Sequence, residues 1–364
     1  MTGPQPRACV TQIPAYVAGK PPQPRAGMTT YKLSSNENPF PPLPGVLEAA
    51  ARAAEEMNRY PDMGNTALYA ALADKLGVGT DHLALATGSV GLIYQLVQAF
   101  CDAGDEVVYA WRSFEAYPIA VTATGARNVQ VPLLTDGRHD LDAMAAAVTD
   151  RTKVVLVCTP NNPTGPSVTQ TELDAFLARI PERVLVVVDE AYVEFVRMSD
   201  AVDGVATVRA HDNVVSTRTF SKAYGLAGFR VGYAVAPPLV ATALRAVSLP
   251  FGISSVAQAA AIASLRAESE LLERVEALVA ERDRVTRGLA ELGLDVPDAQ
   301  GNFVWFAVGE RTAELAAAAD ELGIVIRPFA GDGARVTIGE TEANDRVLEL
   351  ARRWPGEGTA DPLV

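Results

Sequence analysis

The sequence has few of the residues that build disulfide frameworks and metal sites. Its 364 residues include only three cysteines and three histidines. Cys9, Cys101 and Cys158 are odd in number, widely separated and mostly set in apolar runs, which argues against a disulfide framework and a cysteine-based metal site. The histidines are equally scattered, and none stands at a ligand spacing from another metal-binding residue type. We therefore expect reduced, buried thiols and no bound metal.

Basic residues and long apolar runs are also scarce. Lys and Arg number 31 against 44 Asp and Glu, so the formal net charge is −13. No basic cluster resembles a nucleic-acid footprint, and we expect no nucleic-acid partner. No apolar run approaches the ~20 residues that a bilayer-spanning helix needs, and residues 1–20 lack the features of a signal peptide. These absences predict a cytoplasmic protein with no membrane partner.

The chain does have a regular alternation of short apolar runs and helical stretches. Residues 1–45 are rich in Pro and Gly, which predicts an extended arm. Helices are expected at 43–60 and 67–76. Strands are expected at 83–86, 106–110, 128–132, 154–158, 184–188, 214–217 and 231–235. Apolar strands separated by helices predict an α/β domain, with a mostly parallel sheet covered by helices on both faces.

The C-terminal third has a different pattern. Its first feature is a continuous helical pattern over 255–292, which predicts one long helix leading out of the large domain. Strands are then expected at 302–307, 324–327 and 335–338, with helices at 312–322 and 342–353. This mixture predicts a small α+β domain, and the length of the chain suits two domains. The expected division is an arm contributing to the small domain (1–42), a large domain (43–250) and a C-terminal small domain (251–364).

The most informative segment runs from Thr219 to Arg230. It places Lys222 just beyond the carboxyl end of an expected strand, where ligands bind in open α/β sheets. The hydroxyls of Thr219 and Ser221, together with the guanidinium of Arg230, suit a phosphate, whereas the lysine suits an aldehyde. Taken alone, the same segment could be a surface lysine followed by a loop.

Three other expected strands also end in polar residues. Asp189 follows one strand and could pair with a protonated pyridine nitrogen, with Tyr192 three residues later. Asn162 lies in an Asn-Pro-Thr-Gly turn after another strand, and the Gly-rich segment 87–91 opens a helix whose amides could bind phosphate. Each has an ordinary alternative, such as a helix cap or a tight turn. The four segments together, in this order and spacing, point to a shared ligand site far more specifically than any one of them alone.

Together these segments resemble the fold-type I aminotransferases that use pyridoxal 5′-phosphate, within the histidinol-phosphate aminotransferase subgroup. The resemblance extends over essentially the whole chain. It implies that Lys222 forms a Schiff base with the cofactor, that Asp189 pairs with the pyridine nitrogen, and that Tyr192 and Asn162 contact the ring oxygen. It also implies cofactor contacts near the phosphate from Gly88, Ser89, Val90, Thr219, Ser221 and Arg230.

The same resemblance implies further roles at the substrate end and between subunits. Arg335 matches the arginine that binds the substrate carboxylate, and Arg327 matches a residue that helps to bind anionic groups. Asn162 is expected to contact the substrate carboxylate as well. Tyr60 matches a tyrosine that reaches the cofactor phosphate of a neighbouring subunit, which implies a homodimer.

Two positions distinguish the substrates expected within this subgroup. Phe114 is expected to stack on the cofactor ring, and its segment 111–115 resembles actinobacterial aromatic aminotransferases, whereas histidinol-phosphate enzymes usually have tyrosine there. Asn36, expected to line the substrate pocket, lies in a segment typical of histidinol-phosphate enzymes. We predict transfer of the amino group from an aromatic L-amino acid to 2-oxoglutarate, with histidinol-phosphate aminotransferase as the alternative. A lyase or a non-catalytic regulator would be the rival classes.

Overall fold

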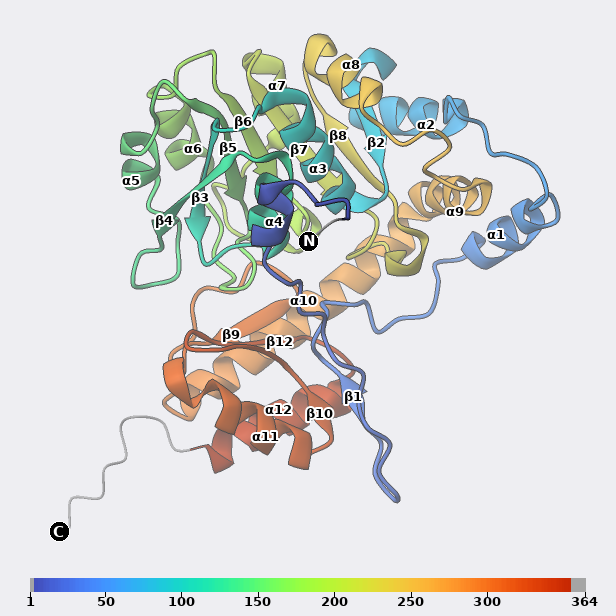
Figure 1. Cartoon of the computed structure of the whole chain (residues 1–364). Coiled ribbons are helices and arrows are strands. Elements are labelled where there is room, and N and C mark those ends of the chain that lie inside the picture. The colour runs from blue at the N-terminus through green and yellow to red at the C-terminus, as the bar shows by residue number, and fades with distance from the viewer. Residues whose placement is uncertain (1–2, 355–364) are drawn as a thin grey trace.

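The computed structural model describes residues 3–354, and its larger part is built around a seven-stranded sheet (Figure 1). The strand order is β2-β8-β7-β6-β5-β3-β4. In that order, the strands span Leu83–Ala86, Gly232–Val235, Val214–Thr219, Leu185–Asp189, Thr152–Cys158, Glu106–Trp111 and Arg127–Pro132. Among these strands, only β8 runs antiparallel to its neighbours. The predicted α/β fold with a mostly parallel sheet is confirmed.

The central strands are apolar because helices cover both faces of the sheet. β5 and β6 are buried along nearly their whole length, as expected of parallel strands between two helical layers. The helices of this part are α1 (Val46–Ala54), α2 (Thr66–Leu76), α3 (Gly88–Phe100), α4 (Ala116–Thr124), α5 (Leu141–Ala146), α6 (Gln170–Leu177), α7 (Gly204–Ala210) and α8 (Pro238–Ala246). Single-turn helices lie at Thr80–His82, Val193–Phe195 and Ala227–Phe229. The result is a sheet whose strand ends, rather than its faces, are open to a ligand.

The smaller part carries an antiparallel sheet in the order β11-β12-β9. Its strands are β9 (Phe303–Phe306), β11 (Arg327–Phe329) and β12 (Gly333–Thr337), and its helices are η5 (Gly309–Arg311), α11 (Thr312–Glu321) and α12 (Thr341–Arg353). The single strand predicted at 324–327 is wrong. Ile324–Val325 forms β10, which pairs with the N-terminal arm, and Arg327 begins β11, which pairs with β12. These two strands are distinct because they pair with different strands, β10 with β1 and β11 with β12.

The long helix predicted over 255–292 is also wrong, because two helices occupy this range. α9 spans Ser255–Arg266 and α10 spans Glu268–Glu291, with the non-helical backbone of Ala267 between them. α9 packs against α1 and α2, whereas α10 continues towards α12 and the small sheet (Figure 1). Each helix follows its own packing surface, and the buried Ala267 allows the change of direction. The start of the small domain at residue 251 stays a prediction.

The N-terminal arm connects both parts. The short helix η1 (Ala8–Gln12) lies against α4, where the Arg7 guanidinium donates to the carbonyl of Ala123. Farther along, β1 (Tyr31–Lys32) pairs in parallel with β10. The predicted arm is therefore largely extended and joins the small domain; residues 1, 2 and 355–364 of the predicted division lie outside the described residues. No helix within residues 3–354 is both long and apolar enough to cross a membrane.

Candidate active site

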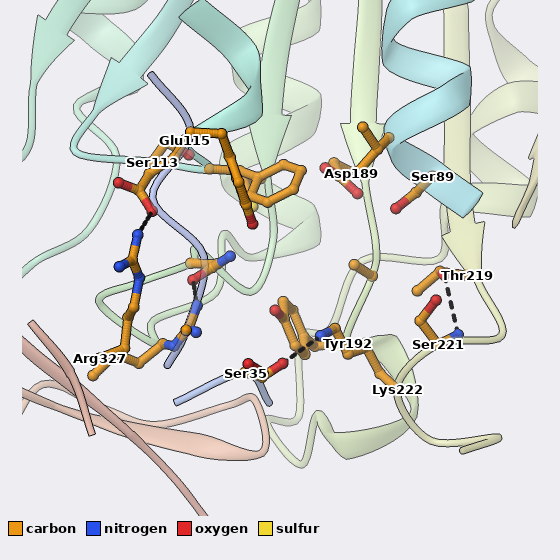
Figure 2. Close-up of a pocket in the computed structure, with 18 of the residues that line it drawn as sticks. Ser35, Ser89, Ser113, Glu115, Asp189, Tyr192, Thr219, Ser221, Lys222 and Arg327 are labelled. Atoms are coloured by element: carbon orange, nitrogen blue, oxygen red, sulfur yellow. Dashed lines mark hydrogen bonds and ion pairs between the residues drawn. The ribbon is translucent and has the colours of Figure 1, made fainter. Parts of the chain in front are cut away.

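A pocket lies at the carboxyl ends of the central strands, facing the small domain (Figure 2). The sequence-predicted residues that line it are Ser89, Val90, Phe114, Asn162, Asp189, Tyr192, Thr219, Ser221, Lys222, Arg230, Arg327 and Arg335. They are far apart in the chain, and the parallel sheet brings them together because it aligns its strand ends at one edge. In Figure 2, Ser89, Thr219 and Ser221 lie on one side of this pocket, with Glu115 and Arg327 on the opposite side.

Lys222 lies in the loop that follows β7. Its Nζ donates to the carbonyl oxygens of Ser35 (3.0 Å) and Asn36 (3.3 Å), both from the N-terminal arm. Burial, helped by the positive charge of Arg335, lowers the pKa of the Lys222 amine from 10.5 to about 7. A large fraction of this amine is therefore neutral near pH 7, which is the form that attacks an aldehyde or accepts a proton.

Asp189 is the last residue of β6 and is buried. Its carboxylate accepts hydrogen bonds from the hydroxyls of Tyr117 (2.7 Å) and Thr217 (3.3 Å). Burial raises the pKa of Asp189 to about 6, while these hydrogen bonds act in the opposite direction. A cationic ring nitrogen placed beside this carboxylate would favour its ionised form. Such an acid suits a pyridinium partner.

The loop after β7 and the start of α3 form an anion-binding corner. Arg230 has φ +56° and donates from Nη1 to the hydroxyl of Ser221 at 3.0 Å. Gly88 has φ +81°, a conformation that favours glycine, and a Cβ added there would lie 2.5 Å from Nη2 of Arg230, so a larger residue would displace the guanidinium. Ser89 and Val90 follow in the first turn of α3, whose free amides favour a phosphate. This set of donors fits the phosphate of the expected cofactor.

Arg335 lies on β12 and enters the pocket from the small domain. Its Nη1 donates to the amide oxygen of Asn162, and its Nη2 donates to the carbonyl of Ser34 at 2.9 Å. Its Nε is buried and has no hydrogen-bond partner among residues 3–354. Burial lowers the pKa of Arg335, yet a guanidinium stays protonated in proteins. Arg335 is therefore charged, its described partners are uncharged, and its Nε is left to donate. Such an arginine is suited to bind a substrate carboxylate.

The substrate end also holds an ion pair that sequence reasoning missed. Arg327 is the first residue of β11, and in the small sheet it lies opposite Arg335 of β12. Its Nη2 donates to Glu115 Oε2 at 2.6 Å, and only 6% of the Arg327 side chain is exposed. Glu115 belongs to segment 111–115, which the sequence analysis singled out. The role of Glu115, however, depends on the approach of a strand more than 200 residues away in the chain. Tyr117 was missed because its hydrogen bond to Asp189 joins residues 72 positions apart.

Two predicted residues lie just outside the pocket wall. Asn36 is fully buried, has φ +51°, and donates through Nδ2 to the hydroxyl of Tyr192 at 3.0 Å. It therefore supports Tyr192 from behind. Gly88, as described above, leaves space beside the guanidinium of Arg230. Phe114, by contrast, lines the pocket and meets the ring of Tyr117 edge-on, with centroids 5.6 Å apart.

Tyr60 is the predicted site residue that lies far from the rest. It is 83% exposed, stacks on Phe251 with ring centroids 4.7 Å apart, and does not line the pocket of its own chain. A role in catalysis would require this tyrosine to enter the pocket of a second copy, as the sequence-based prediction specifies.

Comparison with known proteins agrees with this geometry. Residues 29–350 match the family model of the class I and II aminotransferases. An aromatic amino acid aminotransferase of Streptomyces avermitilis is 57% identical, over 98% of this chain and 99% of the relative. Another from Rhodococcus jostii is 53% identical, over 99% of both chains.

Solved structures give the same result. A histidinol-phosphate aminotransferase from Sinorhizobium meliloti, in complex with pyridoxal 5′-phosphate, superposes with a TM-score of 0.81. It is 33% identical and covers 88% of this chain and 91% of its own. With the matching family model and relatives of more than 50% identity over almost the full length, the chain belongs to the class I and II aminotransferases.

Proposed function

We propose that this protein is a pyridoxal-phosphate-dependent aminotransferase that converts an aromatic L-amino acid and 2-oxoglutarate into the aromatic 2-oxo acid and L-glutamate. The observation that carries this proposal is that the aromatic side chains of Tyr16, Phe114 and Phe329 line the same pocket as Arg335, whose described hydrogen-bond partners are both uncharged. One carboxylate and one aromatic ring are the groups that such a lining binds best. The names of the relatives from Streptomyces and Rhodococcus support the same substrate class.

The residues of the pocket suit the three functional groups of pyridoxal 5′-phosphate. The phosphate would bind at the corner formed by Ser89, Ser221 and Arg230, with Thr219 behind Ser221. The pyridine nitrogen would pair with Asp189. When bound, the cofactor delocalises the negative charge that develops at the substrate Cα.

The remaining ring contacts follow from the hydrogen bonds already present. Asn162 uses its amide oxygen to accept from Arg335, so its NH₂ group is left to donate to the ring oxygen or the substrate carboxylate. Tyr192 receives a hydrogen bond from Asn36, which leaves its own hydroxyl proton available for the ring oxygen. Phe114 would cover one face of the ring.

Lys222 would move the proton in this reaction. Arg335 would hold the substrate carboxylate and so orient the Cα–H bond, and Lys222 would take the proton from Cα. The lowered pKa of Lys222, about 7, allows this amine to accept and release a proton near neutral pH. Closure of the pocket by Tyr16 and Ser35 of the N-terminal arm would limit the access of water.

The pH dependence of cofactor attachment follows from the same amine. In protein stripped of cofactor, the rate at which pyridoxal 5′-phosphate attaches should rise with pH and level off above about 7, because only neutral Lys222 reacts. Stopped-flow absorbance between pH 6 and 10 at constant ionic strength measures this rate. A rate that continues to climb towards pH 10 would mean that burial does not lower the pKa of this lysine.

Histidinol-phosphate aminotransfer is the second candidate. The Ser-Asn-Glu-Asn-Pro segment that carries Asn36, and the likeness to the Sinorhizobium meliloti enzyme, favour it. A phosphate-bearing substrate, however, needs a second free cation, and Arg327 is already paired with Glu115. This pairing supports the aromatic substrate.

A series of half-reactions tests the choice. Phenylalanine, tyrosine and histidinol phosphate are each mixed with the cofactor-loaded protein, and the loss of visible cofactor absorbance is followed at several concentrations. We expect the aromatic amino acids to have the higher ratio of rate to half-saturating concentration. A clear preference for histidinol phosphate would reverse the order of the two candidates.

Two wider features belong to the same proposal. The exposed Tyr60 supports a homodimer in which this side chain reaches the cofactor phosphate of the partner subunit. The three cysteines are all free thiols, which supports the cytoplasm as the compartment. Sedimentation of the cofactor-loaded protein would test the homodimer.

A further inference from the structure

Glu115 forms an ion pair with Arg327 at the substrate end of the pocket, and none of the proposed cofactor contacts uses this carboxylate. It immediately follows Phe114 and precedes the first turn of α4, where a negative charge is favoured by the helix dipole. Its carboxylate crosses to the small domain and accepts from Arg327 at 2.6 Å. About 24% of the Glu115 side chain and 6% of the Arg327 side chain are exposed, so both charges are shielded from solvent.

The neighbouring arginine has no such partner. Arg327 and Arg335 occupy directly paired positions on β11 and β12, and both line the pocket. The described partners of Arg335 are an amide oxygen and a carbonyl oxygen, which carry no charge. Arg335 therefore keeps its positive charge for a ligand, whereas the charge of Arg327 is balanced by Glu115.

We propose that Glu115 is a specificity-determining residue that neutralises Arg327 and so biases the pocket against ligands with a second anionic group. This inference rests on the proposed function, because it concerns how the same pocket chooses between an aromatic side chain and a carboxylate or phosphate. A second anion has to displace the Glu115 carboxylate from Arg327 or lie beside it, and like charges at close range are unfavourable. An aromatic side chain has no such conflict.

2-Oxoglutarate carries the second anionic group that this ion pair disfavours. Its distal carboxylate competes with Glu115 for the guanidinium of Arg327, and binding of this acceptor is weakened by that competition. Aromatic ligands leave the ion pair intact and stack against the nearby ring of Phe329, whose centroid lies 5.1 Å from the Arg327 guanidinium carbon. One pocket can then bind both substrates, with different states of one ion pair.

Equilibrium binding of unreactive analogues tests this role without turnover. Glutarate carries two carboxylates, and 3-phenylpropanoate carries one carboxylate and a ring. Calorimetric titration of the cofactor-loaded protein with each gives the ratio of their dissociation constants. In Glu115→Gln, which keeps the shape but removes the charge, we expect the ratio to shift roughly tenfold in favour of glutarate. An unchanged ratio would overturn the proposal.

Two further variants separate this effect from a general loosening of the pocket. In an Arg327→Gln background, Glu115→Gln should no longer shift the ratio, because its effect is transmitted through that guanidinium. Asp332→Asn removes an acid that pairs with Arg112 between the same loop and the same hairpin but outside the pocket. It should leave the ratio unmoved. A tenfold shift in Asp332→Asn, or one that persists without Arg327, would contradict the proposed role.

The outcome is distinguishable from a failure of the proposed function. If the unaltered protein does not react with phenylalanine or tyrosine, the proposed substrate class is wrong. If it reacts with them and Glu115→Gln leaves the ratio of the two analogues unchanged, only the role of Glu115 is wrong.

Discussion

Lys222→Ala is expected to lower the rate of transamination by at least about a thousandfold, because it removes both the nucleophile and the proton-transferring base. Of the groups lining the pocket, this amine combines deep burial with a pKa of about 7, and the hydroxyls nearby are far weaker bases. The measurement is the half-reaction with phenylalanine at saturating concentration. Covalent cofactor, trapped with borohydride and detected by mass spectrometry, should be lost in the same variant.

A nearby lysine provides the control. Lys32 lies close enough to influence the pKa of Lys222, but its Nζ pairs with Glu37 at 2.8 Å and does not line the pocket. Lys32→Ala should therefore retain borohydride-trapped cofactor. Trapped cofactor and normal transamination in Lys222→Ala would refute the assignment of this lysine. Cofactor found on Lys32 would instead identify a different attachment site.

Arg335→Ala is expected to weaken binding of every carboxylate substrate by about 2 to 5 kcal/mol, the range for removing one partner of a buried charged pair. The loss has two sources. The substrate carboxylate loses its counter-ion, and the amide oxygen of Asn162 and the carbonyl of Ser34 lose their donor. The concentration dependence of the half-reaction with glutamate, and separately with phenylalanine, measures the effect.

Arg335→Lys distinguishes charge from geometry. It keeps the positive charge but cannot donate to the carboxylate from two nitrogens in one plane, so it should recover only part of the lost affinity. The two substrates should be affected alike, since both have an α-carboxylate. An unchanged apparent affinity for glutamate in Arg335→Ala would show that another group binds this carboxylate.

The strand ends of the large domain were predictable because their signal is local. β2, β5 and β6 are short apolar runs, and each is followed within a few residues by a polar segment that the pocket uses. A parallel sheet brings such segments to one edge whatever the intervening helices are. The sequence alone therefore assigns Lys222 and Asp189 to one site.

The errors at α9, α10 and β10 have a different origin. Residues 255–287 contain no Gly or Pro, so nothing local marks the change of direction at Ala267. Residues 324–327 likewise have the pattern of one strand, although Ile324–Val325 pairs with β1 and Arg327 pairs with β12. Local propensity does not encode which surface an element packs against, and long-range contacts decide the boundary.

The sequence by itself determined the α/β class, the order of the strands along the chain and the residues that suit a phosphate, a pyridine ring and an aldehyde. These follow from apolar periodicity and from residue chemistry close to strand ends. Only the tertiary structure decided that Tyr117 bonds Asp189, that Asn36 supports Tyr192 and that Glu115 neutralises Arg327. Those contacts join residues 72, 156 and 212 positions apart, and the folded chain alone brings them within hydrogen-bonding distance.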